Sequence, residues 1–175
     1  CSFARVGEPA PDFNLEGVGG DGEFRRFNLR NHRGKWVVLF FYPLDFTFVC
    51  PTEITQFSEQ IEDFRKLGAV VYGCSTDSVH AHKAWLKELG TLPFPLLSDI
   101  THEVSDAYNV LIPEKGIALR GTFVINPEGV LCWAEYNDLS VGRNVNEILR
   151  VISALQTGEL CPVNWKKGEG TLGKA

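Results

Sequence analysis

Two apolar runs dominate the hydrophobic pattern of the chain, and each predicts a buried strand. Residues 36–42 read Trp-Val-Val-Leu-Phe-Phe-Tyr, and residues 69–74 read Ala-Val-Val-Tyr-Gly-Cys. Continuous runs rich in β-branched and aromatic residues are typical of strands that are covered on both faces. We therefore expect both runs in the interior of a sheet.

A helical pattern follows each of these runs. The first helix is predicted to begin near Pro51 and to end at Gly68, because apolar residues recur at spacings of three and four at Ile54, Phe57, Ile61 and Phe64. The second is predicted to be capped by Ser78, with an inward face made of Trp85, Leu86 and Leu89. The strand–helix–strand–helix order predicts a parallel unit.

The rest of the pattern predicts two hairpins and a last helix. Residues 13–15 and 24–29 flank a glycine-rich turn, and residues 119–125 and 130–136 flank the turn Asn-Pro-Glu-Gly at 126–129. The last helix has an apolar face made of Val145, Ile148, Leu149, Ile152 and Leu155. Together these elements predict an α/β protein with a thioredoxin-like fold, in which helices flank a mixed central β-sheet.

The periodic pattern ceases at residue 157. We predict one domain over residues 1–157 and a C-terminal arm over residues 158–175 that carries Cys161. The net charge of −5, without a cluster of lysine and arginine, argues against nucleic acid as a partner. The longest apolar run is shorter than the roughly 20 residues of a membrane span, so we expect no membrane partner and a cytoplasmic protein.

Five cysteines are present, an odd number at spacings unlike a secreted disulfide framework. We expect free or redox-active thiols in a reducing compartment, with Cys74 and Cys132 as inert apolar residues in strands. There is no CxxC pair, and His80 and His82 fall on nearly opposite sides of a predicted helix. We therefore expect no metal site and no cofactor.

Cys50 stands at the turn from the most buried strand to a helix, which is the best place in the chain for thiol chemistry. The N-terminus of a helix stabilises a thiolate by roughly 0.5–2 kcal/mol. A nearby cation is needed as well, and Arg120 can supply it if its strand neighbours residues 36–42. Thr47 can donate a hydrogen bond to a developing oxyanion, while Pro43 and the aromatic rings at 46 and 48 can exclude water.

The residues around Cys50 also carry a family resemblance. Residues 43–50 read Pro-Leu-Asp-Phe-Thr-Phe-Val-Cys, which matches the P-x-x-x-T-x-x-C signature of the peroxiredoxins. Residues 41–53 resemble the typical two-cysteine branch, which includes the peroxidase subunit of bacterial alkyl hydroperoxide reductase. The resemblance covers nearly the whole chain, through residues 6–13, 120–125, 141–143 and 161–162.

The resemblance implies that the chain is a thiol-dependent peroxidase, and it implies roles for the residues around Cys50. Cys50 is the peroxidatic cysteine, which reduces hydrogen peroxide and organic hydroperoxides and becomes a sulfenic acid. Thr47 and Arg120 bind and polarise the peroxide, and Pro43 shields the thiolate. The pair that holds the central arginine in place is formed by Glu53 and Arg143.

Cys161 resembles the resolving cysteine, which in this branch belongs to the partner subunit. The resemblance therefore implies a homodimer with intersubunit disulfides, and family members often assemble five dimers into a decameric ring. The disulfide would be reduced again by thioredoxin or by a flavoprotein disulfide reductase. A one-cysteine enzyme, with Cys161 as a free thiol, stays open as an alternative.

Other functions fit the residues less well. A cysteine hydrolase needs a histidine base near Cys50, and no histidine lies in a motif for one. A thiol–disulfide oxidoreductase would carry a second cysteine where Glu53 stands. A ring-forming holdase chaperone or a redox-signalling protein remains an alternative as a second activity.

Overall fold

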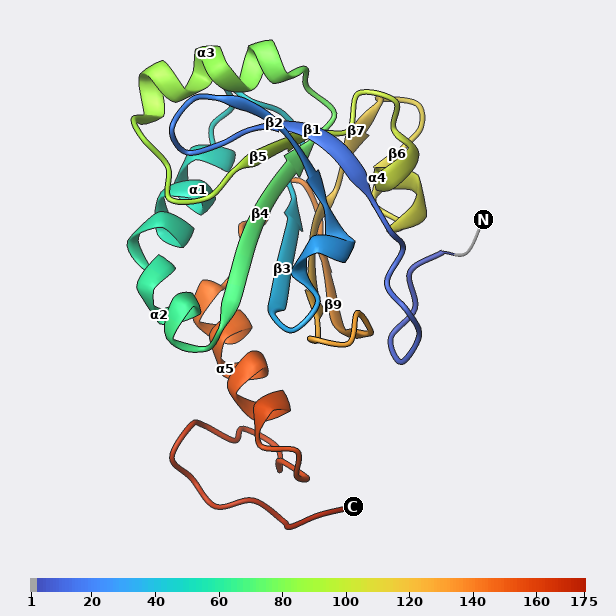
Figure 1. Ribbon diagram of the computed structural model, residues 1–175, viewed down its shortest axis with the longest axis vertical. Helices are drawn as coiled ribbons and strands as arrows, with labels where there is room; N and C mark the ends of the chain where they lie inside the picture. Colours follow the sequence, from blue (N-terminus) through green and yellow to red (C-terminus); the bar gives the residue numbers. More distant parts are fainter. Residues whose placement is uncertain (1–2) are drawn as a thin grey trace. The chain divides into compact units, whose positions relative to one another are not determined.

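The computed structural model describes residues 3–175 (Figure 1). The chain forms two compact units, Cys1–Arg143 and Asn144–Ala175. The predicted assignment of residues 158–175 to a separate arm stays a prediction. No helix in the described part of the chain combines the length and the apolarity that a membrane span requires.

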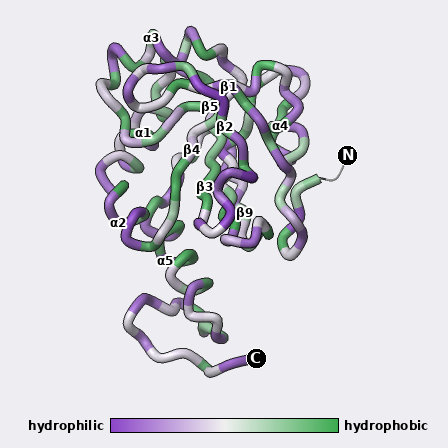
Figure 2. Tube along the Cα trace, viewed as in Figure 1, coloured by the Kyte–Doolittle hydropathy of each residue, from purple (hydrophilic) through white to green (hydrophobic). Residues whose placement is uncertain are grey.

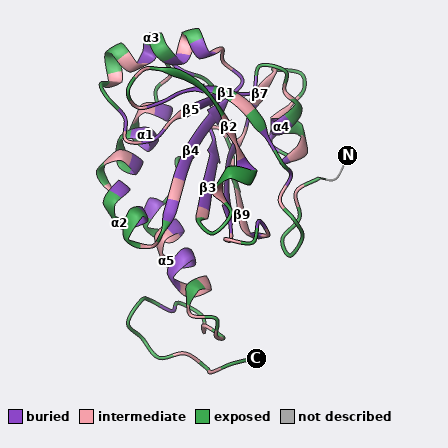
Figure 3. Cartoon of the chain, in the orientation of Figure 1, coloured by how far each residue is buried: buried purple, intermediate pink, exposed green. Residues whose placement is uncertain are grey.

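The first unit is built on a seven-stranded mixed sheet with the order β2-β1-β5-β4-β3-β8-β9. Strand β3 (Trp36–Phe41) pairs in parallel with β4 (Ala69–Ser75) and antiparallel with β8 (Arg120–Ile125). Both apolar runs are thus interior strands, as predicted, and Figure 3 shows them as largely buried. The thioredoxin-like plan of a mixed sheet with flanking helices is confirmed.

Both predicted hairpins are present. Strand β1 (Asn14–Val18) pairs antiparallel with the edge strand β2 (Phe24–Asn28), and β8 pairs antiparallel with β9 (Leu131–Asn137) at the other edge. The short strand β5 (Leu96–Ser98) joins the first hairpin to β4. Because β8 pairs antiparallel with β3, its first residue, Arg120, lies near the end of β3 from which the chain continues to Cys50.

The prediction of one continuous helix between Pro51 and Gly68 is wrong. The structure has α1 (Cys50–Glu59) and α2 (Ile61–Lys66), separated at Gln60, whose φ of −101° and ψ of 11° leave the helical region. The backbone N–H of Gln60 still bonds to the carbonyl of Gln56, so the chain bends there without a gap. No glycine or proline marks the position, and the apolar stripe stays buried across the break.

Helix α3 (Val79–Leu89) begins as predicted, because the Ser78 side chain accepts a hydrogen bond from the N–H of Ala81 at 3.1 Å. Its inward face differs in part from the prediction. Trp85 is buried, but Leu86 and Leu89 are only half-buried, and His82 is completely buried. A polar side chain therefore occupies the centre of this helix face.

The segment between β5 and β8 contains short elements that the pattern did not predict. They are α4 (Glu103–Ala107) and a two-stranded sheet of β6 (Leu111–Ile112) and β7 (Ile117–Ala118). Elsewhere, a 3-10 helix that was also not predicted, η1 (Leu29–His32), follows β2. The core of the first unit contains residues of β3, β4, β8 and the α4 segment. Figure 2 shows hydrophobic residues following β3 and β4.

The second unit begins with the predicted last helix, α5 (Val145–Gln156), capped by the side chain of Asn144. Its irregular segment is tied together by backbone hydrogen bonds between Leu160 and both Leu172 and Gly173, each 2.8 Å long. The guanidinium of Arg150 donates to the carbonyl of Trp165 at 3.0 Å, which links this segment to the helix. Cys161 therefore lies in a hydrogen-bonded segment.

Candidate active site

Cys50 is the first residue of α1 and is completely buried. The N-cap is Val49, and Pro51 occupies the second position of the helix, one residue later than predicted. A proline is tolerated here because the first N–H groups of a helix have no intrahelical acceptor. The thiol thus lies at the N-terminus of a helix, where the helix dipole favours an anion.

Arg120 supplies the cation next to this thiol. Its Nη1 donates to Sγ of Cys50 at 3.3 Å, and its Nε donates to the carbonyl of Leu139 at 2.8 Å. The arginine is the first residue of β8 and is buried. Because the backbone carbonyl fixes the guanidinium, its orientation toward the sulfur is determined by the fold.

Glu53 lies one turn after Cys50 and joins two buried arginines. Its carboxylate accepts from Arg120 Nη1 at 2.6 Å and forms an ion pair with Arg143 Nε at 2.7 Å. The backbone N–H of Arg143 also donates to it at 3.0 Å. Two arginines and one glutamate leave one positive charge in excess, which an anion at the sulfur of Cys50 would balance.

Arg143 is held by the end of the sheet as well. Its Nη1 donates to the carbonyl of Gly121 at 2.7 Å, and its guanidinium lies over the ring of Phe40 at 5.1 Å. Burial lowers the pKa of Arg143 from its usual value, and the nearby Glu53 carboxylate opposes that effect. The glutamate therefore offsets part of the cost of burying two neighbouring guanidinium groups.

The loop between β3 and α1 carries Pro43 and Thr47. Pro43 is buried, and Thr47 is half-buried with its hydroxyl donating to the carbonyl of Leu44 at 2.9 Å. The prediction that the rings of Phe46 and Phe48 exclude water is wrong for the single chain, since 52% and 96% of these residues are exposed. The structure does bring six of the predicted site residues to buried or half-buried positions around the loop and the start of α1: Pro43, Thr47, Cys50, Glu53, Arg120 and Arg143.

The other cysteines differ from Cys50 in their surroundings. Cys161 belongs to the second unit, is half-buried, and lies 3.5 Å from the hydroxyl oxygen of Thr157 and 3.7 Å from the carbonyl oxygen of Ala154. Burial raises the pKa of Cys74 well above its usual value, and burial also raises the pKa of Cys132. Cys50, Cys74, Cys132 and Cys161 are all free thiols, and Cys1 lies outside the described residues.

A buried polar cluster behind the loop was missed in the sequence. It contains Tyr42, Asp45, Asp77 and His82, whose side chains meet between the loop, the end of β4 and α3. A signal was present, because His82 stands three residues after Val79 and three before Trp85, on the inward face of the helix.

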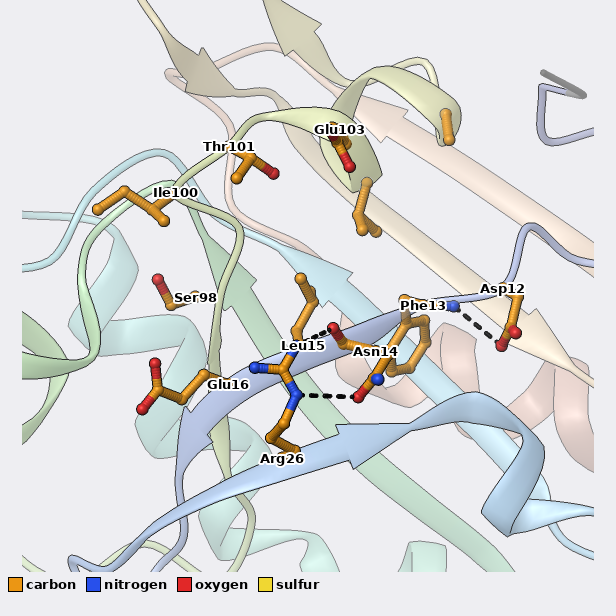
Figure 4. A pocket seen from close by; sticks show the side chains of 12 residues that line it. Asp12, Phe13, Asn14, Leu15, Glu16, Arg26, Ser98, Ile100, Thr101 and Glu103 are labelled. Atoms are coloured by element: carbon orange, nitrogen blue, oxygen red, sulfur yellow. Dashed lines mark hydrogen bonds between the residues drawn. The ribbon is translucent and has the colours of Figure 1, made fainter.

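A separate cavity of about 510 Å³ lies near the other edge of the sheet (Figure 4). Arg26 crosses it and bonds to the side chain and the carbonyl of Asn14. Its rim includes the carboxylates of Asp12, Glu16 and Glu103. None of the predicted site residues lines this cavity, so we do not assign the peroxidase site to it.

Comparison with known proteins agrees with the geometry around Cys50. Residues 6–134 match the AhpC/TSA family. The chain is 53% identical over 175 residues to the putative peroxiredoxin YkuU of Bacillus subtilis, covering 95% of this chain and 97% of that protein. It is 49% identical over 174 residues to a putative peroxiredoxin in the rubredoxin operon of Clostridium pasteurianum, with 95% and 98% covered.

Solved structures agree as well. The reduced 2-Cys peroxiredoxin of Plasmodium vivax has a TM-score of 0.93 at 42% identity, covering 95% of this chain and 92% of that one. AhpC of Mycobacterium tuberculosis has a TM-score of 0.84 at 42% identity, with 94% and 99% covered. The chain therefore belongs to the AhpC/TSA family and is a peroxiredoxin, a thiol-dependent peroxidase.

Proposed function

We propose that Cys50 is the cysteine that reduces the hydroperoxide. The observation that carries this assignment is the donation from Arg120 to Sγ at 3.3 Å, inside a buried cluster with one excess positive charge. The Cys50 thiolate attacks one oxygen of the peroxide, so that an S–O bond forms while the O–O bond breaks. The other oxygen leaves with the electron pair, takes up a proton, and departs as water or an alcohol.

Arg120 can serve both the nucleophile and the leaving oxygen. One guanidinium N–H faces Sγ while others remain for a peroxide oxygen, and fixed donors of this kind stabilise developing negative charge. Thr47 supplies a hydroxyl from the loop, and Pro43 covers the site. Glu53 and Arg143 hold Arg120 in its orientation through the carboxylate that both arginines share.

We propose that Cys161 completes the cycle. Its thiol attacks the sulfenic sulfur of Cys50, water leaves, and a disulfide forms. The proposed partner is Cys161 of a second copy of the chain, so the working unit is a homodimer, with a decameric ring as a larger assembly. The solved relatives named 2-Cys peroxiredoxins support a two-cysteine cycle.

The buried position of Cys50 requires a change of conformation before this disulfide can form. A disulfide needs a Cα–Cα separation of roughly 5.5 Å, and a sulfur that is completely buried offers no approach to a second cysteine. The first turn of α1 must therefore unwind. Hydrogen exchange over residues 49–56 should be faster in the oxidised protein than in the reduced protein, and equal protection would contradict this step.

The disulfide needs an external dithiol, which becomes a disulfide as Cys50 and Cys161 regain their protons. Thioredoxin and a flavoprotein disulfide reductase are the proposed donors. A relative named thioredoxin peroxidase, from Trypanosoma brucei rhodesiense and 47% identical over 182 residues, supports the first. Both donors belong to reducing compartments, so the cytoplasm remains the proposed location.

The direct test is steady-state consumption of hydrogen peroxide and of an organic hydroperoxide by the purified protein, with each reductant in turn. Wild type should consume peroxide with at least one of them, and Cys50→Ser should not. Activity that survives in Cys50→Ser would overturn the assignment. The holdase chaperone stays an alternative second activity, and it predicts that Cys50→Ser still suppresses light scattering by an aggregating client.

A further inference from the structure

His82 is a histidine of α3 with no exposed side-chain surface, and both of its ring nitrogens have oxygen partners. Nδ1 lies 2.6 Å from Oδ2 of Asp45, and Nε2 lies 2.8 Å from the carbonyl oxygen of Leu97. A carboxylate and a backbone carbonyl can only accept hydrogen bonds. With Asp45 ionised, both nitrogens donate, and the contact is an ion pair between an imidazolium and a carboxylate.

The groups that face this ring can stabilise a cation. The Asp45 side chain is 1% exposed and lies against Nδ1. A carboxylate oxygen of Asp77 also lies within 4.8 Å of the ligand atoms of Asp45 and His82. Tyr42 donates to Oδ1 of Asp45 at 2.7 Å, and burial raises the pKa of Tyr42 so that the hydroxyl keeps its proton.

Asp45 is held at three points although it belongs to a loop. Its carboxylate bonds to Tyr42 and His82, and its backbone N–H donates to Oδ2 of Asp77 at 2.9 Å. The same loop carries Pro43 two residues before it and Thr47 two residues after it. An ion pair to α3 thus fixes the middle of the loop that carries both of these proposed site residues.

We propose that the buried Asp45–His82 ion pair is a positioning element of the peroxidase site. It holds the loop so that Pro43 covers Cys50 and the Thr47 hydroxyl is placed for the peroxide. This inference rests on the proposed role of Cys50 and assigns a role to two residues outside the charge cluster. Neither residue touches the reacting sulfur, so both act through the loop.

The pair also predicts where the unwinding of the site stops. Residue 46 has a left-handed backbone with φ of 59°, and its ring lies 6.0 Å from that of Trp85 on α3. Beyond it, the Thr47 hydroxyl donates to the carbonyl of Leu44, within the same loop. We infer that the loop up to Asp45 stays bonded to α3 in the oxidised protein, while residues 47–56 unfold locally.

A metal ion fits the same cluster less well. The separation of 2.6 Å between Nδ1 and Oδ2 is that of a hydrogen bond to a charged group. Two ligands at about 2.0–2.1 Å from a tetrahedral zinc ion would stand more than about 3 Å apart. A shared proton therefore explains the observed distance.

The charge of His82 can be measured without any activity. In an imidazolium the two ring nitrogens have similar ¹⁵N chemical shifts, whereas in a neutral ring they differ widely. We expect the imidazolium pattern for His82 in the reduced wild-type protein at neutral pH, assigned by its disappearance in His82→Gln. A neutral pattern, or a pattern that changes with added Zn²⁺ in the wild type but not in Asp45→Asn, would overturn the proposal.

The positioning role is tested by the rate at which hydrogen peroxide oxidises Cys50 in a single turnover. Asp45→Asn and His82→Gln should each lower this rate by about tenfold, since small displacements of a positioned group cost about one to two orders of magnitude. The double variant should be no slower than the slower single variant, as expected for two residues that form one interaction. His80→Gln, on the exposed side of the same helix, is the matched control and should leave the rate unchanged.

Equal rates in the wild type and all four variants would overturn the positioning role while leaving the proposed function intact, because Cys50→Ser tests that function separately. If His82→Gln does not fold, Asp45→Asn provides the rate, because its side chain has nearly the same shape. In Asp45→Asn, the region of fast hydrogen exchange should extend to residues 42–45. Unchanged protection there would contradict the proposed limit of the opening.

Discussion

Cys50 and Cys161 are the two proposed redox cysteines, and the chain surrounds them in opposite ways. Cys50 is completely buried at the start of α1 and receives a hydrogen bond from a buried guanidinium. Cys161 is half-buried in an irregular segment, and its sulfur lies near the hydroxyl of Thr157 and the carbonyl of Ala154. The Cys50 thiol is bonded to a buried guanidinium inside a charge cluster, whereas the Cys161 thiol lies against a hydroxyl and a backbone carbonyl in a half-buried position.

The difference indicates a division of work between the two thiols. A nucleophile that must meet a small peroxide benefits from fixed donors and from exclusion of water. A thiol that must meet a second protein sulfur needs access and freedom to move. Cys74 provides a third case, because it is as buried as Cys50 but has no arginine bonded to its sulfur, and burial raises its pKa.

The largest expected effect comes from removing each sulfur. Cys50→Ser should abolish peroxide consumption, because no sulfenic acid can form. Cys161→Ser should retain one rapid turnover, measured by stopped-flow fluorescence, and then lose thioredoxin-dependent turnover because the disulfide is missing. A Cys161→Ser variant that turns over at the wild-type rate would support the one-cysteine alternative.

Replacing the cation at Cys50 should come next. Arg120→Met should slow oxidation of Cys50 by about 10²–10³-fold, as removal of a donor to a developing oxyanion does in other enzymes. Arg65→Met is the control, because Arg65 is an exposed arginine paired with Glu62. A loss of less than about threefold in Arg120→Met would show that the helix N-terminus suffices without the arginine.

Glu53→Gln tests what the buried charge cluster contributes to stability without changing the Cys50 sulfur. The change leaves two buried guanidinium groups without their carboxylate, and breaking a buried ion pair in this way costs about 3–5 kcal/mol of the free energy of unfolding. Urea denaturation measures this loss. Glu147→Gln is the comparison, since its pair with Arg150 is about one-third exposed and should contribute less than about 1 kcal/mol. Equal losses in the two variants would contradict the role of burial.

The smallest effect concerns Cys74. Burial raises its pKa, so the folded protein keeps a proton that the unfolded thiol releases above about pH 8.5. The free energy of unfolding should therefore fall as the pH rises, by about 1 kcal/mol for this group between about pH 7 and 9.5. Cys74→Ala should flatten that dependence by the same amount, and an unchanged slope would show that Cys74 titrates normally.

Much of the fold followed from the periodic pattern. The two apolar runs, the hairpins and the Ser78 cap are local signals, and each became the expected element. The break at Gln60 could not be predicted, since no glycine or proline marks it. The burial of His82 depends on Asp45 and Leu97, which are 37 and 15 residues away, so only the tertiary structure shows why a polar residue is tolerated there.

The candidate site was predictable from its motif, but its arrangement was not. That Arg120 reaches Cys50 depends on the pairing of β8 with β3. The 96% exposure of Phe48 depends on the conformation of the loop between β3 and α1, in which Asp45 is buried. Neither follows from residue type or spacing, because both depend on contacts between distant segments.

The central claim is that peroxide oxidises Cys50 because the Arg120 cluster surrounds it. The most direct measurement is mass spectrometry of Cys161→Ser after one equivalent of hydrogen peroxide and trapping with dimedone, a reagent for sulfenic acids. We expect the adduct on Cys50 alone, and its yield should fall in the combined variant Arg120→Met/Cys161→Ser at short times. An adduct mainly on Cys74 or Cys132, or an equal rate with and without Arg120, would contradict the account.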